Sequence, residues 1–318
     1  MKTCFLKIIF FPVFFFLFLN VKAQEKVIFA PHWLAQSQFA GYYVALEKGF
    51  YKAEGLDVII KPLNLTKKNT GDLLNGKADI VSMFLDEAVL LSQNNDILNI
   101  CQTSQNSSLV IVGNEKIKKI SDLEDKNIGH WRGEFGLEFL KILNQKKIFV
   151  SNIEYNTSGI NYFISGAVDA MIAMEYNELF TALNSGLHIT RDNLFYLRDL
   201  GVNTPEEGLY CRTKSLQPKY LKFVKASIKG WEYVRTHKEE SLQIVYKYMR
   251  RDNVPIQKAL QVWMLDNVLA LQKCDMKDKN SKRSFILSQE DYTDLCNLLI
   301  KQGDIESIKP YKSFVYNK

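Results

Sequence analysis

Short apolar runs alternate with amphipathic stretches along most of the chain. Residues 27–30 predict a strand, residues 39–48 predict a helix that ends at Gly49, and residues 56–60 predict a second strand. A strand, a helix and a strand of this length form a βαβ unit, in which the two strands are parallel. We therefore expect a ligand to bind where the first strand ends and the helix begins.

The same alternation continues to the end of the chain. Further strands are expected at residues 78–82, 97–103, 107–112, 127–130, 148–155, 167–173 and 208–213. Further helices are expected at residues 69–75, 86–94, 134–143, 160–165, 176–185, 218–237, 239–249, 255–271 and 289–301. A short helical turn should begin at Ser121, with Glu124 completing a capping box. Repeated strand–helix units indicate an α/β protein.

The length of the chain and the order of these elements predict two lobes. The chain has 318 residues, which exceeds one typical domain. The run at residues 107–112 leads into a second α/β lobe, and residues 208–213 return the chain to the first. We expect lobe 1 to comprise residues 24–106 and 208–318, and lobe 2 to comprise residues 107–207, joined by a two-segment hinge.

The N-terminal segment differs in composition from the rest. Lys2 and Lys7 are basic, residues 8–19 form a nearly unbroken apolar run, and the small residue Ala23 follows. This pattern is typical of a secretory signal peptide, here residues 1–23, with cleavage near Ala23. The apolar run is shorter than the roughly 20 residues that span a bilayer. We expect a periplasmic or otherwise exported protein, with an uncleaved N-terminal anchor as the alternative.

Composition limits the partners. Without residues 1–23, Lys+Arg falls from 41 to 38 against 35 Asp+Glu, and so weak a positive charge gives no reason to expect nucleic acid or an anionic membrane as a partner. Four cysteines remain, at spacings that match no metal motif: Cys101, Cys211, Cys274 and Cys296. Export permits disulfides, so both a Cys274–Cys296 bridge and four buried free thiols stay open.

Residues 32–57, HWLAQSQFAGYYVALEKGFYKAEGLD, form the most informative stretch of the chain. Aromatic rings and two glutamines crowd the end of the first predicted strand: Trp33, Phe39, Tyr42, Tyr43, Gln36 and Gln38. Rings in such a place are often core residues, and they also suit the walls of a ligand site.

This stretch resembles the opening of the NMT1/THI5-like family of periplasmic substrate-binding proteins, above all its pyrimidine-precursor (thiamine-salvage) branch. Those sequences are similar to W-x-P-Q-x-Q-F-A-G-Y-Y-V-A-L-E-K-G-F-Y-x-x-E-G-L-D-V. Ala35 stands where the family usually has Pro, and Ser37 where it has Ala. The resemblance implies a type II periplasmic binding protein fold, in which the G-x-A-D motif at residues 76–79 leads into the edge strand of the first sheet.

A second segment of interest is residues 129–138, GHWRGEFGLE. It follows a predicted strand and opens a predicted helix, whose backbone N–H groups can bind polar ligand atoms. The family resembles V-G-V-W-x-G-G-x-E here, so Trp131 and Gly133 match, and Glu134 lies beside them at the helix start. A plain strand-to-helix turn is the alternative interpretation.

The third segment is residues 169–178, DAMIAMEYNE, which resembles the pyrimidine-branch motif D-A-x-x-A-M-x-Y-N-E-P; Leu179 replaces the usual Pro. For an aminopyrimidine, Glu178 would accept from an amino group or a protonated ring nitrogen, and Asn177 would donate and accept. Tyr176 would stack on the ring. Acidic groups at a helix start are also often simple caps.

The candidate ligand-binding residues are therefore Trp33, Gln38, Phe39, Tyr42, Trp131, Gly133, Glu134, Tyr176, Asn177 and Glu178. Two features depart from the family and leave the ligand less defined than the fold. Met83 and Phe84 replace a small polar pair, and residues 62–71 lack the glycines that relatives have there.

No catalytic motif is present: the sequence has no G-x-S-x-G, no H-E-x-x-H and no Walker loop. We expect no catalytic residue, no cofactor and no metal. The resemblance implies a monomeric solute-binding protein of an ABC importer, which binds a small heteroaromatic ligand in the inter-lobe cleft and docks on a membrane permease. Alternatives are a ligand-sensing module on a membrane receptor and a THI5-type pyrimidine synthase; a sulfonate or a flavin-like ring are alternative ligands.

Overall fold

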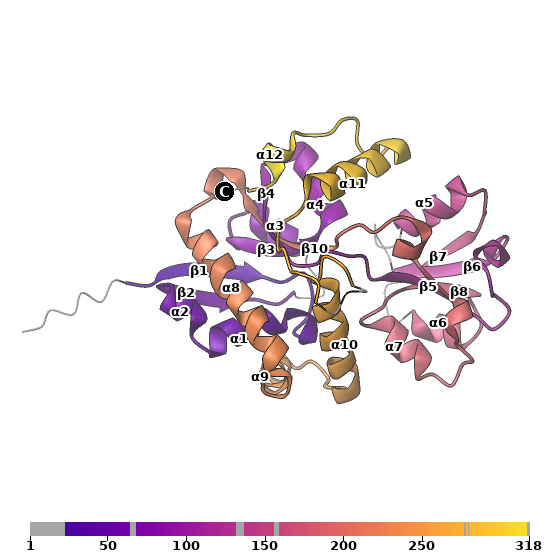
Figure 1. Cartoon of the computed structure of the whole chain (residues 1–318), viewed down its shortest axis with the longest axis horizontal. Coiled ribbons are helices and arrows are strands. Elements are labelled where there is room, and N and C mark those ends of the chain that lie inside the picture. The colour runs from indigo at the N-terminus through magenta and orange to yellow at the C-terminus, as the bar shows by residue number, and fades with distance from the viewer. Residues whose placement is uncertain are drawn as a thin grey trace, which may run out of the picture.

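Two five-stranded sheets form two halves of the molecule that lie side by side in the computed structural model (Figure 1). The structure describes residues 23–63, 68–131, 137–155, 159–276, 278 and 280–316. Almost all of the expected signal peptide lies outside these residues. No helix among them combines the length and the apolarity needed to cross a bilayer.

The first sheet has the strand order β2-β1-β3-β10-β4. Its strands are β1 (Glu25–Ala30), β2 (Leu56–Ile60), β3 (Ile80–Phe84), β4 (Ile97–Gln102) and β10 (Glu207–Arg212). The predicted βαβ unit is confirmed, because β1 and β2 pair in parallel. β10 pairs antiparallel with β3 and with β4. The expectation that the strand after residues 76–79 lies at the sheet edge is wrong: the returning chain inserts β10 beside β3 and makes β3 the central strand.

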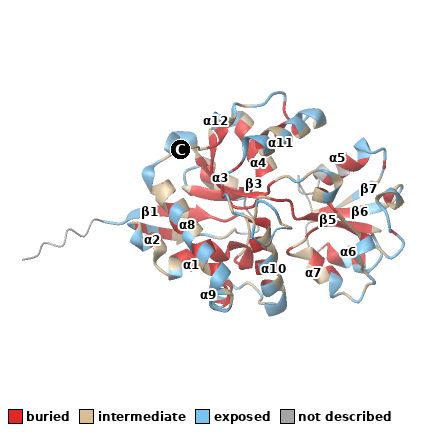
Figure 2. Cartoon of the chain, viewed as in Figure 1, coloured by how far each residue is buried: buried red, intermediate tan, exposed pale blue. Residues whose placement is uncertain are grey.

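Helices cover both faces of the first sheet (Figure 1). On one face lie α1 (Ala40–Glu47), α2 (Phe50–Ala53), α8 (Pro218–Thr236) and α9 (Lys238–Arg251). On the other lie α3 (Asn69–Leu74), α4 (Leu85–Asn94), α11 (Gln289–Gln302) and α12 (Tyr311–Phe314). Because side chains alternate along a strand, Ile80 joins the apolar core of the first face, whereas Val81 and Met83 join the core of the second. Figure 2 shows the strands buried between these layers.

The second sheet has the order β7-β6-β8-β5-β9. Its strands are β5 (Leu109–Gly113), β6 (Asn127–Trp131), β7 (Ser151–Tyr155), β8 (Ala170–Met174) and β9 (Leu194–Tyr196). Its helices are α5 (Leu137–Gln145), α6 (Ile160–Ile164) and α7 (Glu178–Leu183). α10 (Lys258–Leu271) lies at the boundary between the halves and contacts α7 (Figure 1). The 3-10 turns are η1 (Ser37–Phe39), η2 (Ile120–Leu123), η3 (Arg191–Asn193), η4 (Leu197–Leu200) and η5 (Thr213–Ser215).

Two local expectations differ from the structure. The turn η2 does not begin at Ser121, because the Asp122 carboxylate accepts the backbone N–H groups of Lys118 and Lys119 and starts the turn earlier. Glu124 accepts instead from the backbone N–H of Phe149, at 2.8 Å.

The four cysteines within the described residues are free, and Cys274 is exposed, whereas Cys101, Cys211 and Cys296 are buried. The bridge between Cys274 and Cys296 is therefore absent. The alternative, four buried free thiols, is correct for Cys101, Cys211 and Cys296 and wrong for Cys274, which is free but exposed.

The close approach of α1 and α8 fixes the start of α1, next to the predicted site, and it depends on glycine. A Cβ at Gly230 would lie 2.1 Å from the carbonyl oxygen of Gly41, and a Cβ at Gly41 would lie 2.3 Å from the Trp231 ring. Two helices can pack this closely only where side chains are absent from the contact.

We expect Gly230→Ala to lower the free energy of unfolding by about 2 kcal/mol, because the added methyl overpacks a backbone contact. Chemical denaturation measures the change. Gly71→Ala is the matched control: it also lies in a helix, nothing stands within 4 Å of its added Cβ, and a gain of about 0.5–1 kcal/mol is expected. Equal stability of the two variants would contradict the glycine-dependent contact.

Candidate functional site

The two halves are joined where two crossing segments run side by side. The Ser104 N–H donates to the Glu207 carbonyl at 2.9 Å, and the Asn203 side chain donates to Asn106 Oδ1 at the same distance. The Ser107 N–H donates back to Asn203 Oδ1 at 3.0 Å. These bonds satisfy backbone and amide groups at the point where the chain passes between the sheets.

Two tryptophans face one another across the halves. Trp33 follows β1 and Trp131 ends β6; their ring centroids are 6.0 Å apart and their planes are nearly perpendicular. Trp131 Nε1 donates to Glu178 Oε1 at 3.0 Å. All three residues are half-buried. Trp33, Trp131 and Glu178 thus form one continuous group of contacts, from the first half to the start of α7 in the second.

Glu178 is well supplied with protein donors. Oε1 also accepts from Asn177 Nδ2 at 3.1 Å, and Oε2 accepts from the Met174 N–H at 3.0 Å. Burial raises the pKa of this carboxyl. A carboxylate offers about four acceptor positions, and protein donors occupy most of those of Glu178.

A second polar chain crosses the interface at Gln38. Its amide nitrogen donates to Glu207 Oε2 at 3.0 Å and to the Tyr176 hydroxyl at 3.1 Å, which links the first half to the second. The same nitrogen lies 3.2 Å from His32 Nε2, and Gln36 Nε2 donates to Gln38 Oε1 at 2.8 Å. Burial lowers the pKa of His32 to about 3, so the ring is neutral at pH 7.

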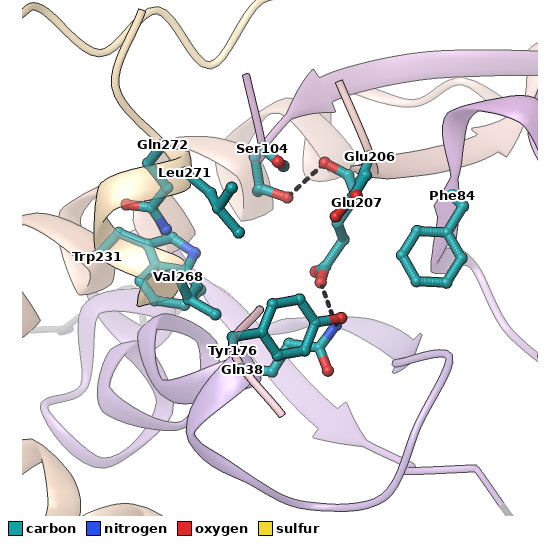
Figure 3. A pocket seen from close by; sticks show the side chains of 11 residues that line it. Gln38, Phe84, Ser104, Tyr176, Glu206, Glu207, Trp231, Val268, Leu271 and Gln272 are labelled. Carbon is teal, nitrogen blue, oxygen red and sulfur yellow. Dashed lines mark hydrogen bonds between the residues drawn. The ribbon is translucent and has the colours of Figure 1, made fainter. Parts of the chain in front are cut away.

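A small cavity of about 20 Å³ lies behind this chain (Figure 3). Its lining comes from both halves: Gln38, Phe84, Thr103, Ser104, Tyr176, Glu206, Glu207, Trp231, Val268, Leu271 and Gln272. That volume holds about one water molecule, far less than the 300–1,000 Å³ of ordinary ligand pockets. A ring-sized ligand would therefore require the halves to part.

A larger hollow of about 210 Å³ lies in the second half, between residues 114–116, 163–168 and 187–189. None of the sequence-predicted site residues lines it.

Two adjacent glutamates at the start of β10 are buried at the hinge. Glu206 accepts from the Ser108 N–H at 2.6 Å, from the Ser108 hydroxyl at 2.7 Å and from the Ser107 hydroxyl at 3.1 Å. Burial raises the pKa of Glu206 to about 7. Burial, with a smaller contribution from Glu206, raises the pKa of Glu207 to about 8.

The structure places the sequence-predicted residues in two groups. Trp33, Gln38, Trp131, Tyr176, Asn177 and Glu178 lie where the halves meet. The Tyr42 ring packs in the core of the first half, 4.7 Å from Phe29 and 5.7 Å from Trp231, so the core interpretation fits it. Phe39 is also fully buried, edge-on to His32. Gly133 and Glu134 lie outside the described residues.

Sequence reasoning missed the glutamate pair, Ser107, Ser108, Trp231 and Gln272. The available signal was the position of residues 206–207, two acids directly before an apolar strand, and the polar run at residues 102–108 between two apolar strands. Among the described residues, no group of three or more His, Cys, Asp or Glu side chains is placed to hold a metal ion.

Two α/β halves of this topology, joined by two crossing segments, define the type II periplasmic binding protein class. The chain belongs to the NMT1/THI5-like family: residues 36–241 match the family model described as NMT1/THI5 like. The fold and the family implied by the opening motif are thereby confirmed.

Similar proteins include a Haemophilus influenzae protein named "Putative thiamine biosynthesis protein", 23% identical over 253 residues that cover 74% of this chain and 77% of that protein. A solved ligand-binding component of an ABC-type import system from Staphylococcus aureus is 15% identical, with a TM-score of 0.65 over 92% of this chain and 97% of that one. The periplasmic aliphatic sulphonate binding protein SsuA from Escherichia coli is 13% identical, with a TM-score of 0.64 over 92% of each chain.

The buried glutamates predict a pH-dependent stability. An unfolded glutamate has a pKa of about 4.3, so both residues bind protons more tightly in the folded protein. Their contribution is fully present below about pH 4 and is lost as the pH rises through about 7 to 8. We expect the free energy of unfolding to fall between about pH 5 and pH 8, by at most about 1.4 kcal/mol per pH unit for each glutamate.

Urea denaturation across that pH range measures the slope. Glu207→Gln removes one of the two titrating groups and should flatten it, whereas the exposed Glu290→Gln, in α11, should not. A slope that is identical in the Glu207 variant and the unmodified protein would show that this carboxyl does not titrate in the range.

Proposed function

We propose that this protein is the exported solute-binding component of an ABC importer, and that it binds a small heteroaromatic ligand between its two halves. The observation that carries the proposal is the pair Trp33 and Trp131, which face one another from different halves beside Glu178. A flat ring between them would contact both halves at once. The fold shared with import-system proteins supports the transport role.

An aminopyrimidine of the thiamine-precursor type is the proposed ligand. Tryptophan rings supply stacking surface, and Glu178 with Asn177 supplies an acceptor and a donor at its edge. The name of the Haemophilus influenzae relative and the family match support the same chemistry.

An anionic ligand such as a sulphonate is disfavoured by charge. Two glutamates line the cavity between the halves, and none of the described residues that line it is a lysine or arginine. Arg198, the nearby cation at the hinge, is paired with Glu175 at 2.8 Å. An anion buried beside carboxyl groups without a paired cation is costly.

Binding would proceed by parting and closure of the halves. The contacts that must break and re-form include Gln38 to Tyr176, and Trp263 Nε1 to the Glu175 carbonyl at 2.8 Å. A ligand that contacts both halves favours the closed state, because its binding free energy differs between the two states. We infer that the closed form docks on a membrane permease, and that residues 1–23 direct export.

We expect aminopyrimidines to raise the melting temperature, since a ligand bound only by the native state stabilises it. Mass spectrometry of small molecules that copurify with the protein identifies the natural ligand. After incubation with the protein, an added pyrimidine should be recovered unaltered, and its conversion would favour a synthase. If no heteroaromatic compound shifted the melting temperature, the proposed site would be refuted.

Trp33→Ala and Trp131→Ala should each weaken aminopyrimidine binding by about 1–3 kcal/mol, the usual effect of removing an aromatic ring that stacks on a base. Isothermal titration calorimetry measures the affinity. Phe149→Ala is the matched control, because Phe149 is an exposed aromatic of the second half with a relative exposure of 59%. Affinities unaffected by both tryptophan changes would place the ligand elsewhere.

Glu178→Ala should weaken binding by about 1–3 kcal/mol, because it leaves a ligand donor without its acceptor. The same change removes the bond to the Met174 N–H, so the melting temperature of the unliganded variant is recorded alongside. Lower stability with unchanged affinity would assign Glu178 to capping α7 alone.

A further inference from the structure

The cavity between the halves holds an unusual set of buried polar atoms without protein partners. These atoms are Glu207 Oε1, both amide atoms of Gln272, and Trp231 Nε1. The three residues expose 7%, 2% and 1% of their surface, respectively. They come from β10, from the end of α10 and from α8, and they line the same space (Figure 3).

Such atoms are rare in folded proteins, because an unsatisfied buried donor or acceptor retains its full desolvation cost. One alone could reflect local packing. Here three residues from separate elements converge on one cavity, while the neighbouring Glu206, Thr103 and Ser104 all have partners. Convergence of this kind is typical of a site that a polar group enters.

The size and the chemistry of the cavity define that group. A volume of about 20 Å³ accepts one water-sized atom with its hydrogens. Glu207 Oε1 is an acceptor on one side of the space, and the Gln272 amide and Trp231 Nε1 lie on the other side (Figure 3), so a group that pairs with Glu207 must donate toward it. An amino group or a hydroxyl can donate to Glu207, whereas a methyl group cannot.

The acidic side chains that line the cavity disfavour an anionic ligand group. Glu206 adjoins Glu207, and no lysine or arginine lines the cavity within the described part of the chain. The site therefore tolerates a neutral or positively charged donor and disfavours an anion.

We propose that this cavity is the subsite for an amino substituent of the ligand, and that Glu207 is the residue that selects for it. The inference rests on the proposed function, since it places one end of the same ligand. Gln38 connects the two sites: it donates to Glu207 in the cavity and to Tyr176 across the interface. Glu178, by contrast, serves the outer edge of the ring.

The test compares two probes, an aminopyrimidine and the matching compound in which a methyl group replaces the amino group at the same ring position. The two are close in size and differ in donors. Calorimetry with the full chain should show a preference for the amino compound of about tenfold to a hundredfold, the usual cost of leaving a buried acceptor unpaired.

Variants assign the preference to one residue. Glu207→Leu keeps the volume and removes the acceptor, so the preference should fall to near one. If the leucine variant fails to fold, Glu207→Gln replaces it in the test. Glutamine can keep the bond to Gln38, and the preference for the amino compound should fall about tenfold. Glu290→Gln is the matched control: Glu290 is an exposed glutamate of α11 outside the cavity, and the preference should persist.

Three results would overturn the inference, and they are distinguishable. Equal affinity of the unmodified protein for both probes would show that the cavity holds water alone, and would leave the stacking site intact. A preference that survives in both Glu207 variants would move the selection elsewhere. Failure of both probes to bind would refute the proposed function, and this inference with it.

Discussion

The bond from Gln38 to Glu207 is the constraint on which the interface depends. A carboxyl group buried between two halves is costly unless it is neutral or bonded. Gln38 supplies one donor to that carboxyl and, from the same nitrogen, a donor to Tyr176 of the second half. Three segments far apart in the chain thereby meet at one amide.

The topology explains why the acid stands at the hinge. The chain leaves the first sheet after β4, builds the second, and returns as β10 between β3 and β4. Glu206 and Glu207, at the start of β10, therefore lie at the crossing between the halves and also line the cavity. Glu206 is held by Ser107 and Ser108 on the other crossing segment, so it ties the two crossings together, while Glu207 turns to the cavity. A ligand that reached Glu207 would contact the segment by which the chain passes between the halves.

Much of the fold could be predicted from the sequence, because each half is built from short apolar strands with clear helical spacing between them. Residues 56–60 form a strand with the predicted bounds, and the predicted return through residues 208–213 corresponds to β10. The central position of β3 could not be predicted, since its second partner, β10, lies more than a hundred residues further along the chain. Local spacing carries no information about such pairing.

The candidate site divides in the same way. Asn177 and Glu178 could be predicted as candidate residues, because they lie together in one continuous sequence motif. Tyr42 belongs to an equally recognisable motif, yet its ring packs against Phe29 and Trp231, because the face of a helix that a side chain occupies depends on what packs there. Glu207 and Gln272 are separated by 65 positions and share a cavity only in the folded chain. Selectivity that depended on such a pair would be invisible to any local pattern.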